Sequence, residues 1–196
     1  MKKVFVVLGL FVLSFSASSQ EDFVSQQQGK LFGIIEGGFL VGNSDNVDNA
    51  PFIFHSSLNY AILRNLSAGV GVGVEFYQDT HLPVSANLMY QFGKSGSVIP
   101  FAKFEAGYQI PLETKMERNY YYYYDYYSPD IRKMDAKGGL LLNPSLGIII
   151  RCNNDMGIVL SAGYRHQQLK YVAKENKDFS QFVEYNRLSL KLGLIF

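Results

Sequence analysis

The chain has 196 residues, the length of one ordinary domain. Hydrophobic residues make up 47% and charged residues 18%, a balance that excludes a long disordered chain. The formal net charge of +1 gives no indication of a nucleic-acid partner. Cys152 is the only cysteine, so no disulfide can form within the chain.

The first residues have the features of a secretory signal. Two lysines after Met1 precede a short apolar run and then a small, polar stretch. The apolar run falls short of the about 20 residues that a membrane-spanning helix needs. We therefore predict a signal peptide over residues 1–19, cleaved after Ser19 or Ser18, and a mature domain over residues 20–196.

The mature chain alternates apolar and polar side chains with a period of two, which is the period of a β-strand. The pattern predicts strands over residues 30–41, 52–62, 66–76, 82–92, 98–110, 139–151, 156–171 and 181–196. The longer connections fall near residues 42–51, 77–81, 111–138 and 172–180, and they alternate with short turns near residues 63–65, 93–97 and 152–155. This organisation predicts an all-β fold, an eight-stranded antiparallel up-and-down transmembrane β-barrel with both termini in the periplasm.

The closing strand has two different faces. One face is purely apolar and ends on an aromatic residue, and it consists of Leu188, Leu190, Leu192, Leu194 and Phe196. Leu190, Leu192, Leu194 and the terminal Phe196 resemble the assembly signal of bacterial outer-membrane barrels. With the strand count, this makes the chain similar to small Gram-negative barrels of the OmpA/OmpX type, among the porin-like families. The resemblance implies an outer-membrane location, contact with outer-membrane lipid and recognition by the barrel-assembly machinery.

Eight charged residues within the strands share one phase, opposite the apolar face. They are Glu36, Glu75, Lys103, Glu105, Arg151, Arg165, Arg187 and Lys191. An Arg or Lys that faces lipid at mid-membrane costs about 2 to 4 kcal/mol, so this phase points into the lumen. We interpret the set as a charge network that pairs across a lumen filled by side chains. A narrow ion or proton path through this plug is the alternative.

The histidines predict neither a metal site nor a catalytic site. His55 lies on the inward phase, His81 at a loop end and His166 on the outward phase, and no two have the spacing of metal ligands. Some small outer-membrane barrels are lipid-modifying hydrolases with a Ser-His-acid set on the outer wall. His166 lacks such partners, because Ser161 has the opposite phase. We predict no catalytic residue, metal or cofactor.

The longest connection contains half of the chain's 14 tyrosines. Within residues 119–130 they are Tyr120, Tyr121, Tyr122, Tyr123, Tyr124, Tyr126 and Tyr127. Tyrosine gives a large, rigid contact surface with a polar tip, so this loop is a candidate binding surface for an extracellular ligand or host surface. The alternative is that it only extends its hairpin or dips into the headgroup region.

The function that we predict is that of a non-enzymatic integral outer-membrane protein with a plugged polar lumen. Its role is structural or surface-binding, chiefly through residues 115–137. Two alternatives stay open: an outer-membrane lipid-modifying enzyme, and a soluble lipocalin-like binder with a small apolar ligand in its core. Fold does not decide among them.

Overall fold

The computed structural model describes residues 25, 27–42, 50–76, 80–92, 97–112, 116–117, 133–153, 155–173 and 180–196. The predicted signal peptide and the Tyr-rich residues 119–130 lie outside these ranges. Within the ranges, no helix is long and apolar enough to cross a membrane.

The described chain is built from strands. Their bounds are β1 (Leu31–Val41), β2 (Phe52–Leu63), β3 (Leu66–Phe76), β4 (Thr80–Gln91), β5 (Val98–Pro111), β6 (Met116–Glu117), β7 (Lys133–Arg151), β8 (Gly157–Ala173) and β9 (Ser180–Ile195). β6 is only two residues long, so eight long strands remain.

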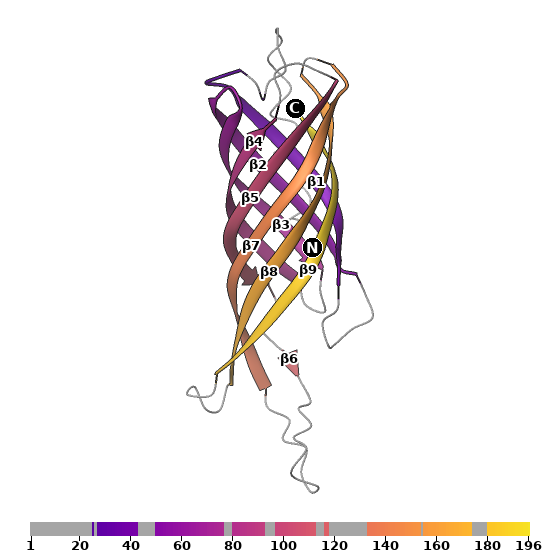
Figure 1. Ribbon diagram of the computed structural model, residues 1–196. Helices are drawn as coiled ribbons and strands as arrows, with labels where there is room; N and C mark the ends of the chain where they lie inside the picture. The colour runs from indigo at the N-terminus through magenta and orange to yellow at the C-terminus, as the bar shows by residue number, and fades with distance from the viewer. Residues whose placement is uncertain are drawn as a thin grey trace, which may run out of the picture.

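The eight long strands form a closed barrel (Figure 1). Each long strand pairs antiparallel with the next long strand along the chain, so that β5 pairs directly with β7. The pairing of β9 with β1 closes the ring. Closure leaves no open edge in the barrel wall, as a lipid-exposed sheet requires. The predicted eight-stranded antiparallel barrel is confirmed.

The pairing register fixes the width of the barrel. A row of paired residues that starts at Tyr90 in β4 and passes once around the wall returns to β4 at Thr80, ten residues earlier. With usual strand spacings, this stagger tilts the strands by about 40° and places the backbone roughly 8 Å from the axis. Such an interior has room for side chains but not for an open channel.

The largest error in the predicted boundaries lies at one connection. We assigned residues 111–138 to a loop, but β6 lies within it and β7 begins at Lys133. A register shift between Ala136 and Gly138 interrupts the alternation there, and Gly138 has a φ of 81°. Because the period of two breaks at this bulge, the sequence pattern did not extend the strand across it.

His81 is a second correction. We placed it at a loop end, whereas it lies inside β4, paired with Glu75 of β3, and it is only 1% exposed. The apolar alternation that we followed begins one residue later, at Leu82, so the first inward position of β4 was missed.

The outer wall of the barrel is apolar. Leu188, Leu190, Leu192 and Leu194 of β9 are all between 43% and 58% exposed, and the other strands show the same pattern. A soluble barrel would bury this face and expose its charges, so the wall needs a lipid environment. The lipocalin-like alternative is not supported.

The terminal Phe196 closes the seam between β9 and β1. Its backbone exchanges two hydrogen bonds with Gly33, with N···O distances of 2.7 and 3.0 Å. The ring lies over Gly33 on the outer wall, since a Cβ at residue 33 would lie 2.7 Å from ring atom Cε2. Only glycine, which has no side chain, allows the Phe196 ring to lie this close to the backbone of residue 33.

The contact of Phe196 with Gly33 predicts an asymmetry between two outward glycines of β1. Gly33→Ala lowers the free energy of unfolding by about 1 to 2 kcal/mol, because the new methyl displaces the ring. Gly37→Ala is the matched control, since its Cβ would lie 3.6 Å from Phe52 Cζ, an ordinary contact. Urea unfolding in detergent micelles measures both variants. Equal stability of the two would show that the seam does not depend on the ring.

Candidate functional site: the lumenal charge network

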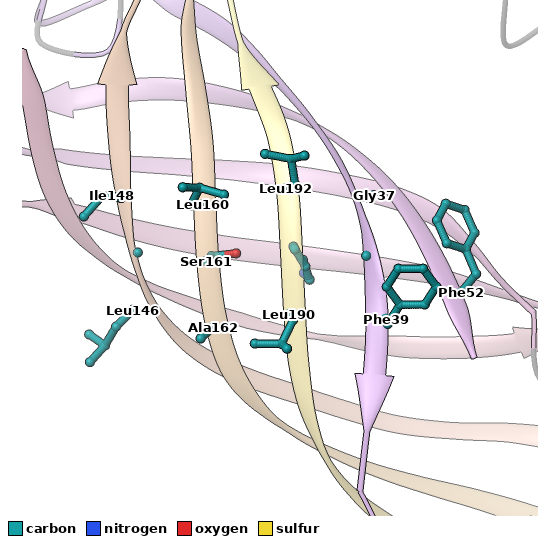
Figure 2. Close-up of a pocket in the computed structure, with 13 residues that line it drawn as sticks. Gly37, Phe39, Phe52, Leu146, Ile148, Leu160, Ser161, Ala162, Leu190 and Leu192 are labelled. Atoms are coloured by element: carbon teal, nitrogen blue, oxygen red, sulfur yellow. The ribbon is translucent and has the colours of Figure 1, made fainter. Parts of the chain in front are cut away.

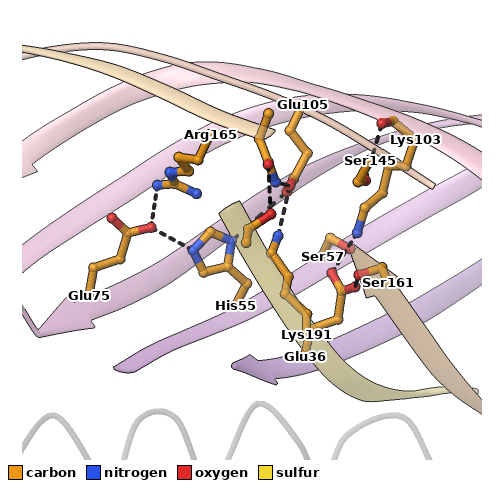
Figure 3. A network of polar contacts seen from close by, with 12 residues as sticks. Glu36, His55, Ser57, Glu75, Lys103, Glu105, Ser145, Ser161, Arg165 and Lys191 are labelled. Carbon is orange, nitrogen blue, oxygen red and sulfur yellow. Dashed lines mark hydrogen bonds and ion pairs between the residues drawn. The ribbon is translucent and has the colours of Figure 1, made fainter. Parts of the chain in front are cut away.

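Two ion pairs lie side by side in the middle of the lumen (Figure 3). Lys103 Nζ of β5 lies 2.5 Å from Glu36 Oε2 of β1, and Lys191 Nζ of β9 lies 2.8 Å from Glu105 Oε2 of β5. All four side chains are at most 5% exposed. They meet because Lys103 and Glu105 are two residues apart on the same face of β5, while β9 and β1 approach from the opposite wall.

A second cluster lies around Glu75 of β3. Arg165 of β8 donates to Glu75 Oε1, and His55 Nε2 of β2 lies 2.9 Å from the same oxygen. His55 Nδ1 lies 3.9 Å from Glu105 Oε1, so the imidazole ring stands between the carboxylates of the two clusters. His55 thereby links the charged residues into one network.

Neutral side chains also donate hydrogen bonds to the three carboxylates. Asn143 Nδ2 donates to Glu105 Oε2 at 2.7 Å, and Ser161 Oγ donates to Glu36 Oε1 at 3.3 Å. Gln109 donates to Glu75 Oε2. Buried charges need such donors in addition to their counter-ions, because water cannot supply them.

Of the eight predicted network residues, the structure brings six together: Glu36, Glu75, Lys103, Glu105, Arg165 and Lys191. Arg187 is also buried and lies opposite Arg165 in the pairing of β8 with β9, with its guanidinium carbon 5.3 Å from the centre of the Tyr185 ring. Arg151 is half-buried at the turn end of β7. His55 was predicted to point inward but was not counted in the network, although it shares the inward phase of Glu75.

A layer of apolar side chains, which was not predicted, lies in the lumen at the end where the short turns are. Its members are Phe32, Ile34, Ala61, Met89, Ile99, Phe101, Ile149, Val159 and Ile195. All of them sit near a strand end, and Gly147 leaves space for the Phe101 ring. Ser67 and Gln91 are buried at the same level, opposite Met89 and Phe101 in the pairing register, so this floor of the lumen is mostly but not wholly apolar.

The outer wall carries a shallow groove across β7, β8, β9, β1 and β2 (Figure 2). It forms where Gly37 and Ala162 interrupt rows of leucine and phenylalanine. Ser161 and Lys191 border it through their backbones, since their side chains point inward to Glu36 and Glu105. The groove therefore presents no polar side chain for chemistry.

His166 lies on the outer wall and has no catalytic partners among the described residues. Its Nδ1 lies 2.7 Å from Asn186 Oδ1, an amide and not a carboxylate. Ser161 faces the lumen instead, so no Ser-His-acid set forms. Among the described residues, no group of three His, Cys, Asp or Glu side chains lies close enough to hold a metal ion.

Two further sets of site residues were predicted, the tyrosines of the long connection and the assembly signal of the closing strand. The tyrosines at 120–127 lie outside the described residues. Leu190, Leu192 and Leu194 point outward along β9, and Phe196 follows them at the seam with β1.

The ion pairs predict strong coupling between Glu36 and Lys103. Lys103→Met removes the cation and leaves a buried carboxylate, which costs about 3 to 5 kcal/mol of unfolding free energy. The double variant Glu36→Gln/Lys103→Met recovers more than half of this loss, because neither charge is left unpaired. Urea unfolding of the single and double variants measures the coupling. A double variant no more stable than Lys103→Met would mean that the pair is not coupled.

No protein-family model matches the chain, and no curated protein matches it either. Solved structures do. Neisserial surface protein A has a TM-score of 0.60 at 9% identity, over 84% of this chain and 95% of that chain. The N-terminal β-barrel domain of OprF from Pseudomonas aeruginosa has a TM-score of 0.55 at 12% identity, over 87% and 98%. The outer membrane protein OprG from the same organism has 0.55 at 11%, over 89% and 98%. At these identities the likeness is one of fold, and the fold is that of small outer-membrane barrels.

Proposed function

We propose that this protein is a non-enzymatic, integral outer-membrane barrel with a plugged lumen, and that it makes contacts at the cell surface. The membrane part serves as a rigid support, and the contacts are made where the chain extends beyond the membrane. The turn end faces the periplasm and the opposite end faces outward.

The observation that carries this proposal is a three-stranded extension at one end of the barrel (Figure 1). The pairing of β5 with β7 ends at Gln109 and Gly139, and that of β1 with β9 ends at Val41 and Leu188. β8 and β9 stay paired as far as Ser180. We call this extension the ribbon: residues 133–138 of β7, 167–173 of β8 and 180–187 of β9. Along β9 it reaches roughly 26 Å past Leu188.

The outer face changes character where the ribbon begins. In the barrel the outward residues of β9 are leucines, whereas in the ribbon a polar pair and a cation–π contact join β8 to β9. Gln168 Nε2 donates to Glu184 Oε1 at 2.7 Å, and Lys170 Nζ lies 5.4 Å from the centre of the Phe182 ring. Such pairs suit water and headgroups rather than hydrocarbon, which supports a ribbon outside the membrane.

The contents of the lumen support a plug and not a path. The charged side chains have their counter-charges within hydrogen-bond distance, and a floor of buried, mostly apolar side chains lies between them and the turn end. A permeating ion would have to displace the paired charges and then the side chains of the floor. We also propose that the closing strand with Phe196 is read by the barrel-assembly machinery during insertion into the outer membrane.

We expect surface binding to be lost when the Tyr-rich residues between β6 and β7 are deleted. Deletion of residues 119–128 lowers adhesion of expressing cells to a host-cell layer by about tenfold, because tyrosines supply the main contact area. Counting of adherent cells measures the effect. Deletion of residues 94–96, at the turn end, is the matched control and leaves adhesion unchanged.

Both deletion variants must reach the outer membrane in equal amount, which detergent extraction of membrane fractions checks. Unchanged adhesion after loss of residues 119–128 would remove the tyrosines from the proposal. An adhesion loss with the turn-end deletion would contradict the assigned orientation.

A further inference from the structure

We propose that the edge of β9 in the ribbon is a binding site for an extended peptide segment of another protein, which adds to the sheet as one more strand. The site comprises residues 180–185. The inference rests on the proposed function in one respect, the position of the ribbon outside the membrane.

Among the described residues this edge has no partner strand, because the pairing of β1 with β9 ends early. The last pair between them is Val41 with Leu188, and Gly42 then has a φ of 147°. A Cβ at residue 42 would lie 3.3 Å from Arg187 Cα and 3.4 Å from Asn186 O, so only glycine allows this departure comfortably. Beyond Leu188, no strand in the described part of the chain pairs with β9 on this side.

The register shows which backbone groups point to this edge. Phe196 and Gly33 exchange two hydrogen bonds, so even-numbered residues of β9 direct their N–H and C=O groups towards β1. The pairing with β8 continues without a shift to Ser180, so the same parity holds in the ribbon. Phe182 and Glu184 therefore present their N–H and C=O groups at the edge, while odd-numbered residues bond to β8.

The opposite edge of the ribbon is protected, and this contrast points to a use for the β9 edge. There β6 pairs with the first residues of β7, at Met116 with Met134. The β7 segment also carries two lysines, whereas residues 180–187 include no lysine and no proline. Proteins usually protect an exposed edge by such means, and an unprotected one invites a further strand.

The occupant is a peptide and not a second copy in the same membrane. Two copies related by rotation about the membrane normal would bring their tilted β9 edges together at an angle of about 80°, too far from antiparallel to form a ladder. An extended peptide has no such constraint and pairs by its main chain. Beside the exposed Phe182 ring, it would carry an apolar or aromatic side chain on its outer face.

A synthetic peptide with the sequence of residues 166–173 is a suitable probe, because β8 is the strand that β9 already pairs with. The experiment measures amide hydrogen exchange of the full mature protein in lipid nanodiscs, with and without this peptide. Without peptide, the amides of Phe182 and Glu184 exchange about 100-fold faster than that of Val183, which bonds to β8. Saturating peptide slows the two fast amides by at least about tenfold.

Two substitutions at residue 184 separate main-chain pairing from side-chain contact. Glu184→Pro removes an N–H at the bare edge, costs no bond to β8 and abolishes protection at Phe182. Glu184→Ala loses the same carboxylate and its bond to Gln168 but keeps the N–H, so it retains the protection. Equal loss in both variants would overturn strand addition.

Two further outcomes would also overturn the inference. Slow exchange of Phe182 and Glu184 without peptide would mean that the chain covers its own edge, with residues 43–49 as the nearest candidates in sequence. Absence of any peptide effect would do the same.

Labelling of a Glu184→Cys variant on intact cells by a bulky maleimide is measured in parallel. If the maleimide labels residue 184, a failed peptide experiment leaves the proposed function standing. If residue 184 is not labelled, the proposed function fails as well.

Discussion

The narrow interior of the barrel is the constraint on which the rest of the structure depends. Eight strands with a stagger of ten residues leave roughly 8 Å between the axis and the backbone, so every inward side chain must fit and find a partner there. Glu36, Glu105 and Glu75 meet this demand with a cation each and with neutral donors. The same closure forces every second residue outward, where only lipid suits a wall of leucine, valine and phenylalanine.

The interior is layered along the barrel axis. Charged pairs occupy the middle and the apolar residues around Phe101 form the floor. A layered plug of this kind joins walls that are far apart in sequence, since Lys191 of the last strand bonds to Glu105 of β5. The barrel is thus cross-linked from inside, which suits a rigid support for a surface ribbon better than it suits a conduit.

Much of the fold could be predicted because a lipid-facing barrel repeats one rule along every strand. The inward phase of Glu36 and Lys191 followed directly from that rule, as did the outward leucines of β9. The rule does not tell which inward residues meet, because contacts across the lumen depend on register and tilt. His55 was therefore left out of the network, although its ring lies between Glu75 and Glu105. The β7 strand of the ribbon was missed where a bulge at Gly138 broke the period.

The most direct test of the central claim, a closed barrel with an apolar exterior and a paired polar lumen, is electrophoresis of cell fractions with and without boiling. The account predicts that the protein is found only in the membrane fraction, that detergent is needed to extract it, and that boiling changes its mobility as the barrel unfolds. Recovery in the soluble fraction, with the same mobility before and after boiling, would contradict it. That result would mean that the apolar wall is not in contact with lipid.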